Sequence, residues 1–255
     1  MNIINKVLIP LDFSESAINA AKYVSGMIAR DRRITCILYH VSQHTNLSSD
    51  EKKLIEIKSK WFDAKGYDCE VLVTNGDFVK KLIEDQARLK VDLIVMGMAE
   101  NKLKQRSFTL DLLKDANCPL MIVPQRVADF KLDAIALALD ENEFDSKEGL
   151  QLFHDIAKWF NAKVHLIKVD KEGKGGVHTL KTEDTLEYYL ESLDYQYSFP
   201  VNEDIEKGIL NYIRDKGIDA LAILPKTHAQ KSEPSEGRLT KILAKHTEVP
   251  LLVLD

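Results

Sequence analysis

Short apolar runs alternate along the chain with longer segments in which apolar residues recur every three or four positions. The run 6–12 is mostly apolar and ends in an acid. The segment 14–28 is typical of a helix with one apolar face, formed by Ile18, Ala21, Val24 and Ile28. Ser14 can cap the amino end of this helix. Short apolar runs that alternate with such helices predict a parallel β-sheet covered by helices on both faces.

The same succession of elements occurs twice. Apolar runs end in an acid at Asp12 and again at Asp140, 128 positions later. The next runs end at Val41 and Val169, which are also 128 positions apart. A repeat in the same order and at constant spacing indicates that the second half of the chain is a copy of the first.

Two further runs extend the repeat to the end of each half. Val-Asp-Leu-Ile at 91–94 recurs as Ile-Asp-Ala-Leu at 218–221. The run that starts at Pro119 recurs at Pro250. With the helical segments between them, each half reads as strand and helix in alternation, ending on a fifth strand.

Length and composition agree with two domains of ordinary size. The chain has 255 residues, of which 45% are hydrophobic, enough for two cores. We therefore predict two tandem Rossmann-like α/β domains, over 1–125 and 132–255. Each should contain a five-stranded parallel sheet with helices on both faces, and a short polar linker should join them.

Charge and hydropathy narrow the classes of partner. The net charge is −5 and acidic and basic residues are interspersed, whereas a nucleic-acid binder usually shows a basic face. No apolar run approaches the ~20 residues of a membrane span, and the amino terminus does not resemble a signal peptide. We expect a cytoplasmic protein that binds neither nucleic acid nor membrane.

The residues that usually carry catalysis form no recognisable pattern. Cys36, Cys69 and Cys118 have no metal-binding spacing and are interpreted as reduced thiols, and the seven histidines show no metal spacing either. No Ser-His-Asp order stands out and Gly-x-Ser-x-Gly does not occur. The glycine-rich stretch 173–176 lacks the Gly-Lys-Ser/Thr ending of a phosphate loop. We expect no enzymatic activity and no metal.

Several of the repeated segments are similar to those of the UspA-type universal stress proteins. In the first half these are Pro-Leu-Asp-Phe-Ser at 10–14, the run that ends at Gly97, and Asn-Cys-Pro-Leu-Met-Ile-Val at 117–123. In the second half Leu-Asp at 139–140, Gly-Ile-Asp at 217–219 and Val-Pro at 249–250 recur at the same places. The resemblance covers nearly the whole chain and is to the tandem type with two domains in one polypeptide.

This resemblance implies a fold, a pairing mode and a ligand. Each domain would be of the adenine-nucleotide α-hydrolase-like type. The last strands, 120–123 and 251–254, would pair to make an internal pseudo-dimer, and a homodimer or another protein partner would be compatible with it. Some family members bind ATP. In those members the acid after the first strand, here Asp12, meets ribose or metal, and backbone near the end of the second strand, here Val41, meets adenine.

The phosphate loop of the ATP-binding members has the pattern Gly-x-x-Gly-x9-Gly-Ser/Thr, and the first half matches it only in part. Gly97 is the first glycine, but Glu100 and Arg106 replace the other two, and Ser107 provides the hydroxyl. The loop is also shorter than the pattern. Glu100 would repel a triphosphate, although neighbouring basic residues could offset its charge. The first domain therefore remains a candidate for ATP binding.

The second half has lost a different part of the pattern. Pro225 stands at the first glycine, Gly237 matches the third, and Arg238 replaces the Ser/Thr. Pro225 cannot donate an N–H to a phosphate. Asp140 keeps the acid after the first strand, although there, as at Asp12, the acid can also serve as a turn former or favour a helix amino end.

Three functional hypotheses follow. The first is a non-catalytic stress-response protein that acts as a binding or signalling module, with degenerate ATP loops and no cofactor. The second is an ATP-binding protein that uses the first domain only, through Asp12, Val41, Gly97 and Ser107, with weak or no hydrolysis. The third, an enzyme of the wider nucleotide α-hydrolase-like superfamily, lacks a nucleophilic or adenylating signature.

Overall fold

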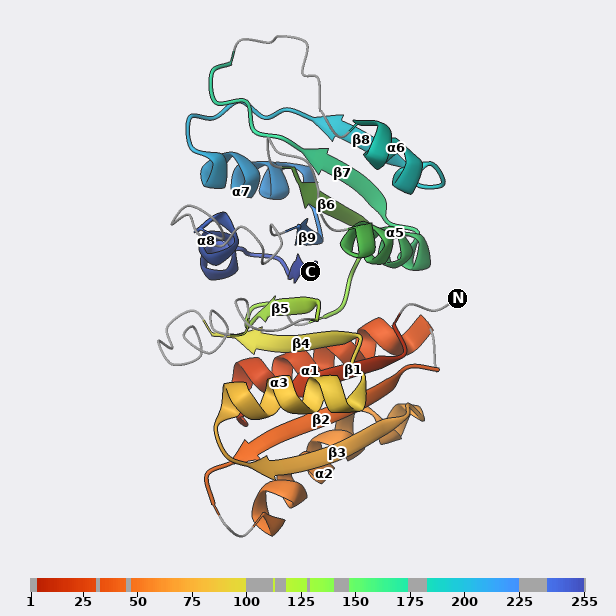
Figure 1. The fold of residues 1–255 in the computed structure, drawn as a ribbon, viewed down its shortest axis with the longest axis vertical. Helices are drawn as coiled ribbons and strands as arrows, with labels where there is room; N and C mark the ends of the chain where they lie inside the picture. The colour runs from red at the N-terminus through yellow and green to blue at the C-terminus, as the bar shows by residue number, and fades with distance from the viewer. Residues whose placement is uncertain are drawn as a thin grey trace. The chain divides into compact units, whose positions relative to one another are not determined.

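The computed structural model divides the chain into two compact units, Met1–Phe130 and Lys131–Asp255. The residues that it describes are 4–30, 33–44, 47–99, 112, 118–127, 129–139, 147–173, 183–224 and 238–254. Both units have an α/β fold with a parallel sheet, as the hydrophobic pattern predicts (Figure 1).

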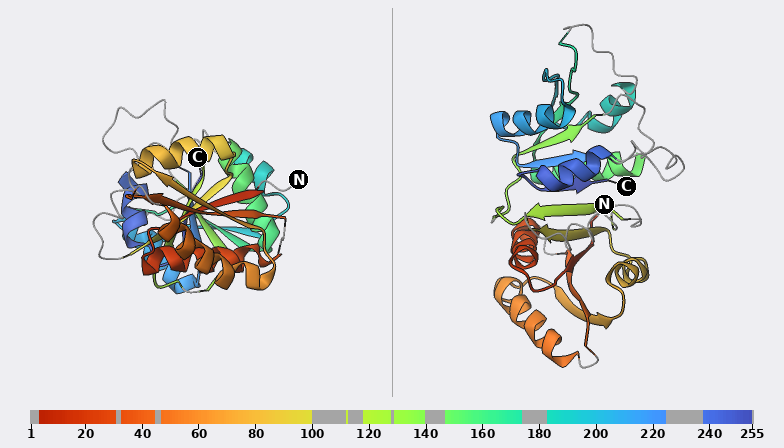
Figure 2. Two further views of the ribbon diagram at one scale, coloured as in Figure 1. Left: turned by 90° about the horizontal axis from the view of Figure 1, so that it is seen from below. Right: turned by 90° about the vertical axis from the view of Figure 1, so that its left-hand side faces the viewer.

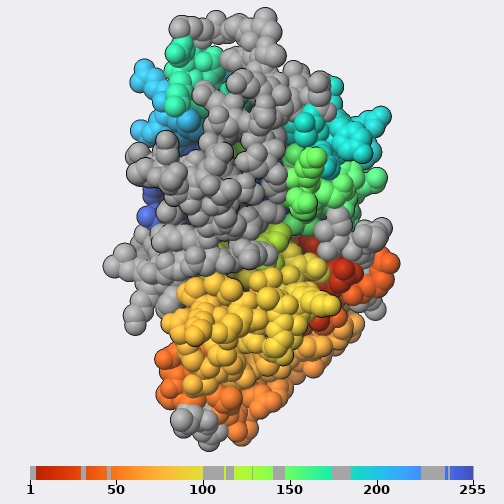
Figure 3. Space-filling model, in the orientation of Figure 1, coloured from red at the N-terminus to blue at the C-terminus, as the bar shows by residue number. Residues whose placement is uncertain are grey.

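The first unit contains a five-stranded parallel sheet in the order β3-β2-β1-β4-β5. Its elements are β1 (Lys6–Pro10), α1 (Glu15–Met27), η1 (Ile28–Arg30), β2 (Thr35–Ser42), α2 (Ser48–Trp61), η2 (Asp63–Lys65), β3 (Cys69–Asn75), α3 (Phe78–Leu89), β4 (Leu93–Met98) and β5 (Leu120–Pro124). Helices α1 and α2 lie on one face of this sheet and α3 on the other (Figure 2). In the space-filling view α3 covers the near side of the unit (Figure 3).

The second unit repeats this topology, with the strand order β10-β9-β6-β7-β8. Its elements are β6 (Ala134–Ala138), α5 (Lys147–Phe160), β7 (Lys163–Ile167), α6 (Glu183–Leu190), β8 (Tyr195–Ser198), α7 (Ile205–Lys216), β9 (Ala220–Ile223), α8 (Arg238–His246) and β10 (Leu251–Val253). The order of strands along the chain is the same in both units, so the duplication read from the sequence extends to the fold.

The local sequence explains the burial of β1 and the first residues of α1 and α3. Val7, Leu8 and Ile9 are fully buried, because β1 is covered by helices on both sides. The Ser14 hydroxyl accepts a hydrogen bond from the N–H of Ala17 at 3.3 Å, so Ser14 caps α1 as predicted. Asp77 caps α3 in the same way.

Residues 124, 127, 129 and 130 contact α1 and extend the first unit beyond position 125. The Asn19 side chain donates a hydrogen bond to the carbonyl of Val127 at 2.7 Å. The Phe130 ring lies edge-on to Tyr23, with centroids 5.2 Å apart, and Gly26 leaves the space for it, since a Cβ there would stand 2.8 Å from the Cβ of Phe130. Most of the polar segment predicted as a linker is therefore anchored to the first unit.

One aspartate in each unit ties the sheet together at the amino ends of its strands. Asp92 accepts hydrogen bonds from the backbone N–H groups of Asn5 and Lys6 at 2.8 and 2.9 Å. Asp219 accepts from those of Asp133 and Ala134 at 2.8 and 3.0 Å. The repeated Val-Asp and Ile-Asp segments thus perform the same structural task in both copies.

Candidate functional site

The predicted site lies at the carboxyl ends of the strands in the first unit, where the strand order reverses. From β1 the chain passes to β2 on one side, and it later returns to β4 on the other side of β1. In open parallel sheets, ligands bind beyond the carboxyl ends of the strands at such a reversal. Asp12 follows β1 and Gly97 lies in β4, so the two residues flank this position.

Asp12 is exposed and takes part in the turn that leads into α1. Its Oδ1 accepts a hydrogen bond from the backbone N–H of Ser14 at 3.0 Å. This contact is the turn-forming role of an aspartate. The side chain thus forms the turn and is at the same time accessible to solvent at the carboxyl edge of the sheet.

Val41 lies where β2 extends beyond β1. The ladder between β1 and β2 ends at Pro10 and Tyr39, whereas the ladder between β2 and β3 continues to Ser42. The side chain of Val41 is buried, with 7% of its surface exposed. At Val41, therefore, the side of β2 that faces β1 consists of backbone beyond the last residue pair of the β1–β2 ladder.

Gly97 is required by the packing of α1 on β4. A Cβ at this position would stand 1.9 Å from the carbonyl oxygen of Ser16, in the first turn of α1. No side chain fits there without displacement of the backbone. Packing alone therefore explains the glycine, and its match to the phosphate-loop pattern carries less weight than the sequence indicates.

The strand register corrects the residue that corresponds to Gly97 in the second unit. Val7 and its repeat counterpart Ile135 pair with Leu93 and Ala220, respectively. Counting along β4 and β9 from these partners places Leu224 opposite Gly97, not Pro225 as the sequence comparison assumed. A half-buried leucine occupies this position. Its side chain prevents the close approach of a phosphate to the backbone that a glycine would allow.

Four of the predicted site residues lie outside the described part of the chain. These are Arg106, Ser107, Asp140 and Gly237. Asp12, Val41 and Gly97 are described, and all three belong to the carboxyl edge of the first sheet.

The structure adds a polar cluster at this edge that the sequence did not reveal. The Nδ1 of His40 lies 2.6 Å from the carbonyl oxygen of Leu11, and its Nε2 lies 3.5 Å from a carboxylate oxygen of Asp50. The ring packs at a tilt against Phe13, with centroids 4.5 Å apart. Phe13 has a φ of 62°, which is rare for a residue with a side chain, and the Lys53 ammonium lies 4.8 Å from its ring centre.

Asp50 is the buried charge at the centre of this cluster. The Ser42 hydroxyl donates a hydrogen bond to it at 2.6 Å, and Lys53 lies 3.4 Å away. Hydrogen bonding from Ser42 and, after it, the charges of His40 and Lys53 lower the pKa of Asp50 below its ordinary value, despite burial. Only the histidine at the end of β2 could have hinted at the cluster, because Asp50 looks like an ordinary helix acid in the sequence.

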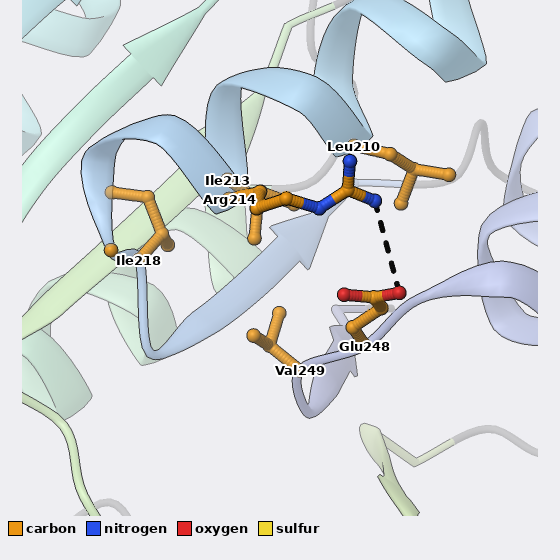
Figure 4. Close-up of a pocket in the computed structure, with 7 residues that line it drawn as sticks. Leu210, Ile213, Arg214, Ile218, Glu248 and Val249 are labelled. Carbon is orange, nitrogen blue, oxygen red and sulfur yellow. Dashed lines mark ion pairs between the residues drawn. The ribbon is translucent and has the colours of Figure 1, made fainter.

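A small pocket lies at the opposite edge of the second sheet, at the amino ends of β9 and β10. It has a volume of about 150 Å³ and is lined by Leu210, Ile213, Arg214, Gly217, Ile218, Glu248 and Val249. Arg214 and Glu248 face each other across it at 3.8 Å (Figure 4). Pockets for drug-sized ligands are usually ~300 Å³ or more, so this one is too small for a nucleotide, and no predicted site residue lines it.

Two other kinds of site can be addressed over the described ranges. Within them, no three histidine, cysteine, aspartate or glutamate side chains come together as metal ligands would. No helix among the same residues has both the length and the apolar character needed to cross a membrane.

Comparison with known proteins gives matches of two kinds. Residues 4–124 match the model of the universal stress protein family. A universal stress protein from Archaeoglobus fulgidus has a similar structure, with 18% identity and a TM-score of 0.76 over 98% of each chain. A functionally unknown protein from Pseudomonas aeruginosa is 15% identical, with a TM-score of 0.70 over 98% of this chain and 92% of the other. Among curated proteins, none matches.

Proposed function

We propose that this chain is a member of the universal stress protein family, whose model its residues 4–124 match, and that it acts as a non-catalytic binding or signalling module of the stress response. The observation that carries this proposal is the packing of Gly97 against Ser16. The one family glycine kept in the first loop is needed for the fold, so its presence does not argue for a phosphate site. The second unit lacks a glycine at that position, where Leu224 stands.

A second candidate function is ATP binding by the first unit alone, with weak or no hydrolysis. The backbone edge at Val41, beyond the end of the β1–β2 ladder, favours it, since adenine could pair with main-chain groups there. The exposed carboxylate of Asp12 would meet the ribose, and Gly97, Arg106 and Ser107 would approach the phosphates.

The remaining parts of the proposal concern partners and location. The strands β5 and β10 would pair to form an internal pseudo-dimer, and the chain would act in the cytoplasm on a protein partner. The second unit, with Asp140 and Gly237, would contribute architecture rather than a nucleotide site.

Calorimetric titration with ATP, preceded by mass spectrometry of the purified protein for co-purified nucleotide, distinguishes the two functions. The first predicts no bound nucleotide and no heat of binding at millimolar ATP. The second predicts binding that Asp12→Ala abolishes, without appreciable release of ADP. Asp77→Ala is the matched control, because it also removes an aspartate that accepts a backbone hydrogen bond before a helix, but at α3.

A further inference from the structure

A serine, a histidine and an aspartate meet on the second unit, away from the candidate nucleotide site. His154 lies in α5, Asp155 is the next residue, and Ser192 follows α6. The Nδ1 of His154 lies 2.6 Å from Oδ1 of Asp155, and its Nε2 lies 3.0 Å from the hydroxyl oxygen of Ser192. Their order along the chain hides this contact, because folding must bring the turn after α6 onto α5.

The hydrogen bonds assign complementary roles to the three side chains. A carboxylate only accepts, so the Nδ1 of His154 carries a proton that it donates to Asp155. In the neutral imidazole, Nε2 is then a base that accepts the hydroxyl proton of Ser192. The same division of roles activates the nucleophile in serine hydrolases, and it is identified by geometry rather than by sequence order.

A further hydrogen bond holds Asp155 in place, whereas Ser192 is open to solvent. Gln151 donates a hydrogen bond to Oδ1 of Asp155 at 3.0 Å, which holds the carboxylate against the imidazole. The His154 and Asp155 side chains are only 15% and 26% exposed. Ser192 itself is exposed, and the hydrogen bond from the N–H of Leu193 to the carbonyl of Leu190 at 2.9 Å fixes the turn that presents it.

We propose that Ser192 is an activated nucleophile that accepts acyl groups from activated esters. The serine oxygen attacks the ester carbonyl carbon while its proton passes to the Nε2 of His154. The tetrahedral intermediate then collapses, and the leaving alcohol takes up that proton. The product is an ester on Ser192 and a free alcohol, so no oxidant, reductant or metal is needed.

The exposure of Ser192 also defines how far the reaction goes. Water, rather than a set of fixed donors, solvates the oxyanion at an exposed serine, and fixed donors account for much of the rate of serine hydrolases. The site therefore reacts with donors that have good leaving groups and modifies the protein once, rather than turning over many substrates. This is a covalent modification of a binding module and is independent of nucleotide binding.

A fluorophosphonate probe, which forms a stable bond with activated serines, tests the proposal on the full chain. We expect one label per molecule, located by peptide mass spectrometry at Ser192. Ser192→Ala should abolish it. His154→Gln should slow it at least about tenfold, less than the ~10²-fold or more of general-base catalysis in an enclosed site. Ser59→Ala is the matched control, because Ser59 contacts Asp63 without a histidine, and it should label like the unmodified protein.

A second measurement keeps the test independent of folding effects. In Ser192→Cys, alkylation of the new thiol should be faster than in the double variant Ser192→Cys/His154→Gln, while thermal unfolding of the two proteins is compared directly. An absent label, a label that survives Ser192→Ala, or equal rates with and without His154 would each overturn the proposal.

Discussion

At the scale of the single residue, Gly97 shows how a motif position can be fixed by packing. Its Cα faces the Ser16 carbonyl so closely that even a methyl group would overlap with it. The sequence shows a glycine in a loop-like pattern but not the helix above it. A functional role inferred from such a glycine must therefore be checked against the packing of the neighbouring backbone.

Gly97→Ala should therefore lower the free energy of unfolding by about 3 kcal/mol, the upper end of overpacking costs. Urea unfolding followed by circular dichroism measures it. Gly66→Ala serves as the control, because its Cβ would have open space and only the φ of 70° opposes it. A Gly97→Ala protein as stable as the unmodified one would contradict the packing interpretation.

The two repeated aspartates make a second prediction at this scale. Asp92→Ala removes the acceptor of two backbone N–H groups and should cost about 2 kcal/mol of stability, the usual range for hydrogen bonds to a charged group. Asp219→Ala should cost a similar amount. Asp92→Asn, which keeps an acceptor oxygen, should lose less. Urea midpoints of the three variants provide the comparison, and equal losses for Ala and Asn would argue against the hydrogen bonds.

At the scale of the element, α2 is attached to the end of β2 through one buried carboxylate. The Ser42 hydroxyl, at the end of β2, donates to Asp50 in the first turn of α2. The hydrophobic pattern predicted β1, β2, β4 and β5 and the amphipathic helices well, since burial alone decides those elements. It could not predict this attachment, because a single polar contact between a strand and the helix that follows it leaves no periodic signal.

Ser42→Ala should raise the pKa of Asp50 toward its ordinary value of 3.8, because the Ser42 hydrogen bond is the largest cause of the lowering. NMR titration of the carboxyl carbon measures this shift. A carboxyl group whose pKa is lowered by folding stabilises the protein at pH values above its ordinary pKa. This contribution is lost as the pH falls below 3.8. Asp50→Asn should thus be less stable than the unmodified protein at neutral pH, and the difference should shrink in acid.

At the scale of the whole molecule, the chain is a duplicated fold whose copies differ at the position of Gly97. The strand order is the same in both units, but Gly97 corresponds to Leu224. Sequence alone predicted the duplication and the parallel sheets, because apolar runs repeat at fixed spacing. It could not predict the Ser192 constellation or the Asp50 cluster, since both depend on side-chain contacts between elements that only the fold brings together.

The pairing of the last strands makes the prediction at this scale. Within each unit, alternate N–H groups of a parallel strand point toward its one neighbour. If β5 and β10 pair, the amides of 120–123 and 251–253 should all exchange slowly with deuterium, since the N–H groups that point away from the neighbour within the unit would be hydrogen-bonded too. Slow exchange at alternate positions only would contradict the pseudo-dimer. Residue-resolved exchange by NMR distinguishes the two patterns.

The aspartates at the amino ends of the strands have an evolutionary consequence. Asp92 and Asp219 hold each sheet from the end opposite to the one where ligands are expected. Mutations at the carboxyl ends can accumulate in either copy without loss of these contacts. The contacts that hold the fold and the positions open to recognition thus lie at opposite ends of the same domain, so substitutions at one end leave the architecture at the other end intact.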